Sequence, residues 1–145
     1  MYKHLLIATD GSSASDKAIV YGLALAKALS AKVTVATVTE SWTQAAYATV
    51  PTPSLIRVYE EAAARNAATI LNGAKKRFDQ GGAQCETCHV KDKHAPEGII
   101  WAAEDRGCDL IVVGSYGHSA VGRILLGSTS LKVLTFSQVP VLICR

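Results

Sequence analysis

Short apolar runs alternate with helix-like segments from one end of this 145-residue chain to the other. The runs have strand length and are rich in β-branched residues, and they predict strands at residues 3–9, 33–39, 83–90, 109–113 and 139–144. Helical periodicity, bounded by serine, proline or glycine, predicts helices at 13–29, 54–78, 96–106 and 128–137, with a loop over 40–53. Strands that alternate with helices form a parallel sheet with right-handed crossovers. The pattern therefore predicts an α/β fold, a doubly wound five-stranded parallel sheet with helices on both faces.

No linker, repeat or low-complexity tract interrupts this alternation. A chain of this length is also long enough to bury one sizeable core. We therefore expect a single domain over residues 1–145.

The strand expected at 109–113 leads directly into a glycine-rich stretch. It reads Gly114-Ser115-Tyr116-Gly117, and after nine further residues comes Gly127-Ser128-Thr129. Glycine lets the backbone approach a ligand closely, with successive N–H groups aimed at an anion. The start of the last helix, at Ser128, also favours negative charge through its first N–H groups and its dipole. Both halves of the motif predict a phosphorylated ligand.

The spacing GxxG, nine residues, then G[ST] resembles the nucleotide-binding signature of the universal stress protein family, in its ATP-binding branch. Three more features match in order, and together with the glycines they span nearly the whole chain: Ile7-Ala-Thr-Asp-Gly-Ser12, Asp109-Leu-Ile-Val-Val-Gly-Ser115 and Val139-Pro-Val-Leu-Ile143. The resemblance implies the strand order 3-2-1-4-5. In that order the chain reverses direction across the sheet between the first and fourth strands, and ligands bind outside the carboxyl ends of the strands at that point.

The resemblance also implies roles for residues at these strand ends. Asp10 resembles the family's acidic residue close to adenine and ribose, where a carboxylate accepts a ribose hydroxyl or holds the loop at Gly11; a cap on the first helix is the structural alternative. Ala8 and Thr9 would line the base pocket and Val38 would form an apolar wall against adenine, although all three also suit a core. Arg123 suits a phosphate but equally an exposed loop. The full predicted set is Ala8, Thr9, Asp10, Val38, Gly114, Ser115, Gly117, His118, Arg123, Gly127, Ser128 and Thr129.

The predicted ligand is ATP, with ADP or AMP left open, and with Mg or Mn held mainly by the phosphates and by no protein side chain. The predicted function is an ATP-binding regulatory module in the stress response. A slow ATP hydrolase is the alternative, although the loop offers no carboxylate or glutamine to orient water. We predict no catalytic residue. The resemblance further implies a homodimer through the apolar edge strand at 139–144.

A third alternative, a redox or haem protein, comes from Cys85-Glu-Thr-Cys88-His89. Side chains along a strand alternate between faces, so these two cysteines should point apart and lie about 10 Å from each other. That separation is too large for a disulfide or a shared metal. Cys108 and Cys144 flank apolar strands and are expected in the core.

The composition of the chain limits the classes of partner that we expect. The net charge is only +3 and the lysines and arginines are scattered, which disfavours nucleic acid. No apolar run approaches the roughly 20 residues that cross a bilayer, so no membrane partner is expected. The apolar stretch at 5–8 is too short for the core of a signal peptide, and we therefore expect a cytoplasmic protein.

Overall fold

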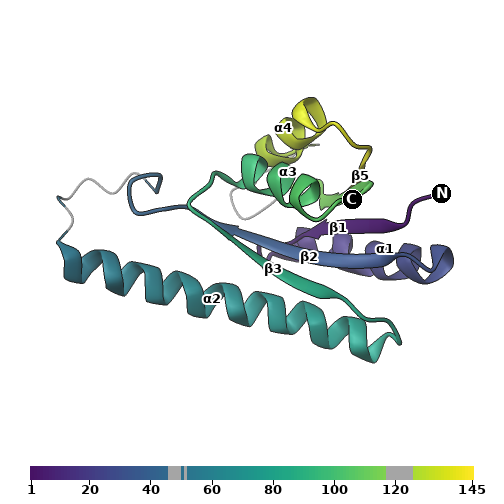
Figure 1. Cartoon of the computed structure of the whole chain (residues 1–145), viewed down its shortest axis with the longest axis horizontal. Coiled ribbons are helices and arrows are strands. Elements are labelled where there is room, and N and C mark those ends of the chain that lie inside the picture. The colour runs from purple at the N-terminus through teal and green to yellow at the C-terminus, as the bar shows by residue number, and fades with distance from the viewer. Residues whose placement is uncertain (46–49, 51, 117–125) are drawn as a thin grey trace.

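The computed structural model describes residues 1–45, 50, 52–116 and 126–145, and these form one parallel sheet with helices on both faces (Figure 1). In chain order the elements are β1 (His4–Ala8), α1 (Ser13–Leu29), β2 (Lys32–Thr39), α2 (Pro53–Gln80), β3 (Glu86–Lys91), α3 (Ala95–Asp105), β4 (Leu110–Gly114), α4 (Ser128–Phe136) and β5 (Val141–Cys144). All neighbouring strands pair in parallel, in the order β3-β2-β1-β4-β5. The predicted fold class and strand order are confirmed.

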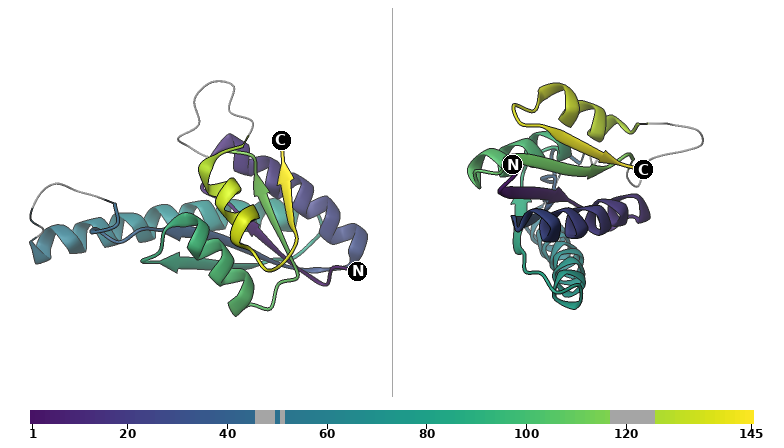
Figure 2. Two further views of the ribbon diagram at one scale, coloured as in Figure 1. Left: turned by 90° about the horizontal axis from the view of Figure 1, so that it is seen from above. Right: turned by 90° about the vertical axis from the view of Figure 1, so that its right-hand side faces the viewer.

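The sheet separates two apolar cores. Helices α1 and α2 cover one face and α3 and α4 the other, as the two turned views show (Figure 2). Strand β1 supplies both cores by simple alternation, since Leu5 and Ile7 face α1 and α2 while Leu6 and Ala8 face α3 and α4. A strand buried on both faces has no polar side, and this explains the continuous apolar run in the sequence.

The long helix α2 begins one residue before the predicted start. Thr52, and not Ser54, is its N-cap, because the Thr52 hydroxyl accepts the Leu55 amide at 3.2 Å and Pro53 fits the first helical position. Its N-terminal half extends beyond the sheet (Figure 1), and its fully buried residues begin only at Ala67. Tyr59 lies in this half of the helix. It is half-buried and donates to the Glu40 carbonyl oxygen at 2.6 Å instead of entering the core.

Three strands are shorter than predicted: β1 lacks one residue at each end, and β3 and β5 begin later. β5 begins at Val141 because Val139 is folded into a turn, where its N–H donates to the Ser137 hydroxyl at 3.1 Å and its carbonyl accepts that hydroxyl at 2.8 Å. β3 begins at Glu86 and forms one edge of the sheet, as its alternating polar sequence predicts.

The four cysteines are free and buried. Cys85 lies in the core beneath α1 and α2, whereas Cys88 lies in the core beneath α3 and α4, so the predicted opposite orientation is confirmed. Burial raises the pKa of the Cys108 thiol to about 11. Within the described residues, no group of three or more His, Cys, Asp or Glu side chains is placed to hold a metal ion.

None of the described helices has the length and hydropathy of a membrane-spanning segment.

Candidate functional site

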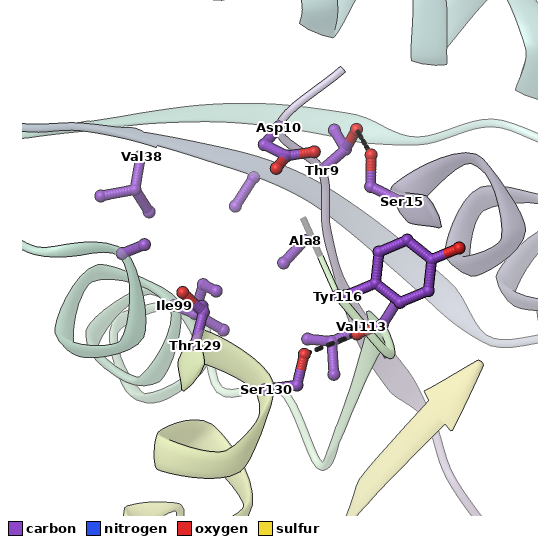
Figure 3. Close-up of a pocket in the computed structure, with 13 residues that line it drawn as sticks. Ala8, Thr9, Asp10, Ser15, Val38, Ile99, Val113, Tyr116, Thr129 and Ser130 are labelled. Carbon is purple, nitrogen blue, oxygen red and sulfur yellow. Dashed lines mark hydrogen bonds between the residues drawn. The ribbon is translucent and has the colours of Figure 1, made fainter. Parts of the chain in front are cut away.

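A pocket opens at the carboxyl ends of β1, β2 and β4, where the sheet order reverses direction (Figure 3). Its empty space is about 550 Å³, including part of the solvent at its mouth. The described residues that line it are Ala8, Thr9, Asp10, Ser15, Ala36, Val38, Ala95, Ile99, Val113, Gly114, Tyr116, Thr129 and Ser130.

The turn after β1 carries the only carboxylate among these described lining residues, Asp10. Its Oδ1 accepts the Ser12 amide at 2.9 Å, and Gly11 takes a φ of +80°, a conformation that favours glycine. The cap of α1 is Ser12, whose hydroxyl accepts the Ser15 amide at 3.2 Å. The helix-cap alternative for Asp10 is therefore wrong. The carboxylate fixes the turn at Gly11, one of the two roles expected from the sequence.

Behind this turn lie two buried hydroxyl groups in contact. Thr9 Oγ1 and Ser15 Oγ are 3.0 Å apart, and each residue is 5% exposed. The Gly11 amide donates to Thr9 Oγ1 at 3.2 Å, and the Ser15 hydroxyl donates to the Ser12 carbonyl oxygen at 2.9 Å. These bonds tie the end of β1 to the first turn of α1.

The side of the pocket next to α3 is an apolar compartment. Val38 and Ile99 stand on this side in Figure 3, opposite Tyr116. Helix α3 packs closely here because Gly98 has no side chain: a Cβ at that position would lie 2.6 Å from Val38 Cγ1. The compartment offers an apolar wall of the kind that a nucleobase needs.

The third side of the pocket is formed where β4 meets the start of α4. Here the two halves of the glycine motif are in contact, since the Gly127 amide donates to the Ser115 carbonyl oxygen and a Cβ at Gly127 would lie 3.0 Å from Tyr116 Cα. The Ser130 hydroxyl donates to the Gly114 carbonyl oxygen at 2.6 Å, the second dashed bond in Figure 3. Gly127 is the N-cap of α4 and supplies no side-chain cap. The first N–H groups of α4 thus lack the capping side chain that a serine or aspartate would provide.

The structure brings most of the predicted residues to this pocket. Ala8, Thr9, Asp10, Val38, Gly114 and Thr129 line it. Ser115, Gly127 and Ser128 lie beside it, at the junction of β4 and α4. Gly117, His118 and Arg123 lie outside the described residues.

Sequence reasoning missed Ser15, Ala36, Ala95, Ile99, Val113, Tyr116 and Ser130 as lining residues. A signal existed for Ala36, because it lies two positions before Val38 and strand residues two apart share a face. Val113 belongs to the core beneath α3 and α4 and also lines the pocket. No sequence signal distinguished Ser15 from its serine neighbours, because its role depends on contact with Thr9.

Comparisons with known proteins agree with this geometry. The family model described as "Universal stress protein family" matches residues 1–145. The chain is 36% identical to the universal stress protein YxiE of Bacillus subtilis, over the full length of both. The solved structure of UspA from Lactobacillus plantarum has a TM-score of 0.83 at 21% identity, covering 99% of this chain and 98% of that one.

A universal stress protein solved in complex with cAMP has a TM-score of 0.70 at 28% identity, covering 99% of this chain and 97% of that one. The matches of sequence and of fold extend over the whole chain or nearly so. This chain therefore belongs to the universal stress protein family.

Proposed function

We propose that this chain binds an adenine nucleotide, ATP, in the pocket at the ends of β1, β2 and β4, and acts as a cytoplasmic regulatory module in the stress response. The observation that carries the proposal is the start of α4. Its N-cap residue, Gly127, has no side chain to cap the helix and meets the Ser115–Tyr116 backbone at the switch point of the sheet. Helix N-termini of this kind favour phosphate groups.

The described lining supports one orientation of the nucleotide. The base would occupy the apolar compartment between Val38 and Ile99, and the ribose would lie beside Asp10. The phosphates would lie at Thr129 and the first N–H groups of α4. The relative solved with cAMP, an adenine nucleotide, supports this ligand class.

A divalent ion, Mg or Mn, would be held mainly by the phosphates of the nucleotide. Asp10 is the only carboxylate among the described lining residues, and it already accepts the Ser12 amide. One such group fits a metal bound through the ligand better than a metal bound by the protein. The same scarcity of acid and base groups supports binding over hydrolysis.

The proposed partner is a second copy of the chain, paired through β5. This strand is an edge of the sheet, and its outer surface is apolar, with Leu142 38% exposed. Tyr21 of α1, 55% exposed, lies in the same shallow groove as Leu142. Antiparallel pairing about a two-fold axis would satisfy the N–H and C=O groups along this edge.

The proposal is tested with a charge placed at the start of α4. Ser128→Glu should leave the protein folded, because a carboxylate near a helix N-terminus interacts favourably with the helix dipole. It should nevertheless weaken ATP binding by repelling the phosphates. The matched control is Ser54→Glu, which places the same charge in the first turn of α2, away from the pocket lining.

The measurement is the melting temperature with and without Mg-ATP. At ATP near 100 times the dissociation constant, the wild type and Ser54→Glu should each gain about 2.7 kcal/mol of stability, whereas Ser128→Glu should gain much less. Mass spectrometry of small molecules released from fresh protein would identify any nucleotide that co-purifies. No stabilisation of the wild type by ATP, ADP or AMP would overturn the proposal.

A further inference from the structure

The protons of the hydroxyl groups behind Asp10 can be assigned from the hydrogen bonds. The Ser15 hydroxyl has one proton and lies 2.9 Å from the Ser12 carbonyl oxygen, which can only accept. Ser15 Oγ must therefore accept in its 3.0 Å contact with Thr9 Oγ1, and Thr9 must donate. Thr9 Oγ1 in turn accepts the Gly11 amide at 3.2 Å.

This assignment leaves neither hydroxyl with a proton for a ligand. The Ser12 amide is also used, because it donates to Asp10 Oδ1. The side chains of Thr9, Asp10 and Ser15 thus present only acceptor oxygens along this edge of the pocket. A ligand group that binds here must bring a proton of its own, as a sugar hydroxyl does and a phosphate at neutral pH does not.

We propose that Ser15 and Thr9 are positioning residues, which hold the Asp10 turn so that its carboxylate selects a ligand carrying a free ribose hydroxyl. The inference rests on the proposed binding of ATP. Thr9 reaches the turn through the Gly11 amide, and Ser15 fixes the Thr9 proton away from the ligand. Without Ser15, the Thr9 hydroxyl proton can donate to another acceptor at this edge of the pocket. The charged acceptor there is the Asp10 carboxylate.

Ser130 supplies a matched control on the other side of the same pocket. Like Ser15, it is a buried serine at the start of a helix, lines the pocket and donates its proton to a backbone carbonyl oxygen. Its acceptor is the Gly114 carbonyl oxygen, and among the described residues it makes no hydrogen bond to the Asp10 turn. Loss of the Ser130 hydroxyl should therefore leave recognition of the sugar unchanged.

The experiment measures dissociation constants by titration calorimetry for Mg-ATP, 2′-deoxy-ATP and 3′-deoxy-ATP. In the wild type, loss of the recognised hydroxyl should weaken binding by about tenfold or more, the usual effect of a hydrogen bond to a charged group. In Ser15→Ala and Thr9→Val this ratio should fall to about twofold or less. Ser130→Ala leaves Thr9 and Ser15 unchanged, and Thr9→Ser keeps a hydroxyl that can donate to Ser15. Both variants should retain the wild-type ratio.

Each result decides a separate question. A wild type that binds none of the three nucleotides would overturn the proposed function itself. If the wild type binds all three equally, or if Ser15→Ala and Thr9→Val keep its selectivity, the inference fails while nucleotide binding stands. Asp10→Asn by itself should remove the selectivity for the ribose hydroxyl. The double variant with Ser15→Ala should show the same ratio of dissociation constants as Asp10→Asn. If either Ser15→Ala or Thr9→Val fails to fold, the other variant alone tests the inference.

Discussion

Gly114 is predicted to be a packing position, so Gly114→Ala should destabilise the protein even without a ligand. A Cβ built at Gly114 would lie 2.6 Å from the Ala14 carbonyl oxygen, 2.8 Å from the Ala14 carbonyl carbon and 3.2 Å from the Ser15 amide nitrogen. All three atoms are backbone atoms in the first turn of α1, so no side chain can rotate to make room. The whole helix start must move, and it is tied to β1 by the contact between Ser15 and Thr9.

The expected size follows from this geometry. Overpacking of a buried site typically costs about 1–3 kcal/mol, and a clash with backbone belongs at the upper end. Alanine also restricts the unfolded chain, which offsets roughly 0.4–1 kcal/mol. A net loss of about 2 kcal/mol should lower the melting temperature by about 4–8 °C in a domain of this size.

The assay is thermal and urea unfolding of the ligand-free protein, with Gly73→Ala as the control. Gly73 lies inside α2, and a Cβ there would meet no atom within 4 Å. That substitution should stabilise the helix by roughly 0.5–1 kcal/mol. The two glycine-to-alanine changes should therefore have opposite signs. A Gly114→Ala protein that melts within about a degree of the wild type would refute the packing argument.

Three further outcomes are expected. Val141→Lys, which places a charge on the apolar edge strand, should shift the protein toward monomer in sedimentation; a wild type already monomeric at high concentration would contradict the proposed dimer. Phosphate release at saturating Mg-ATP should be far slower than the roughly 1–100 per second of kinases, and rapid release that is lost in Ser128→Ala would favour the hydrolase alternative. Burial raises the pKa of Cys108 from 9.0 to about 11, so the unfolded chain ionises first. Stability should therefore fall between pH 9 and 11, and Cys108→Ala should reduce that fall.

Much of the fold follows from the sequence because each local signal has a direct structural cause. The runs at β1 and β4 are apolar throughout since both faces of these strands are buried, and the alternation with helices then requires a parallel sheet. The strand order came from the family resemblance, because pairing depends on contacts distant in sequence. The start of α2 was missed by one residue because Thr52 and Ser54 are both good caps, and only the bond to the Leu55 amide decides between them.

The candidate site was predicted in part for a similar reason. Motif spacing located the strand ends and the start of α4, and these supply most of the lining. Ser15, Ala95 and Ile99 come from helices that fold back over the sheet, and no local pattern says which of their residues reach the pocket. The sequence left three roles open for Asp10. The structure shows one of them, the bond that holds the Gly11 loop, and gives the cap on α1 to Ser12.

The glycines near the pocket bring helix starts together as much as they give room to a ligand. Gly114 accommodates the first turn of α1, Gly98 lets α3 approach Val38, and Gly127 lies against Tyr116 at the start of α4. Within the described residues, neither α3 nor α4 has a side-chain cap, and their first turns supply Ala95 and Thr129 to the pocket lining. The positive ends of these helices therefore converge on a lining whose described residues include no lysine or arginine. Since attraction for phosphate then depends on helix packing, glycine substitutions should change stability and binding together. Substitutions of Thr9 or Ser15 should mainly change which sugar is bound.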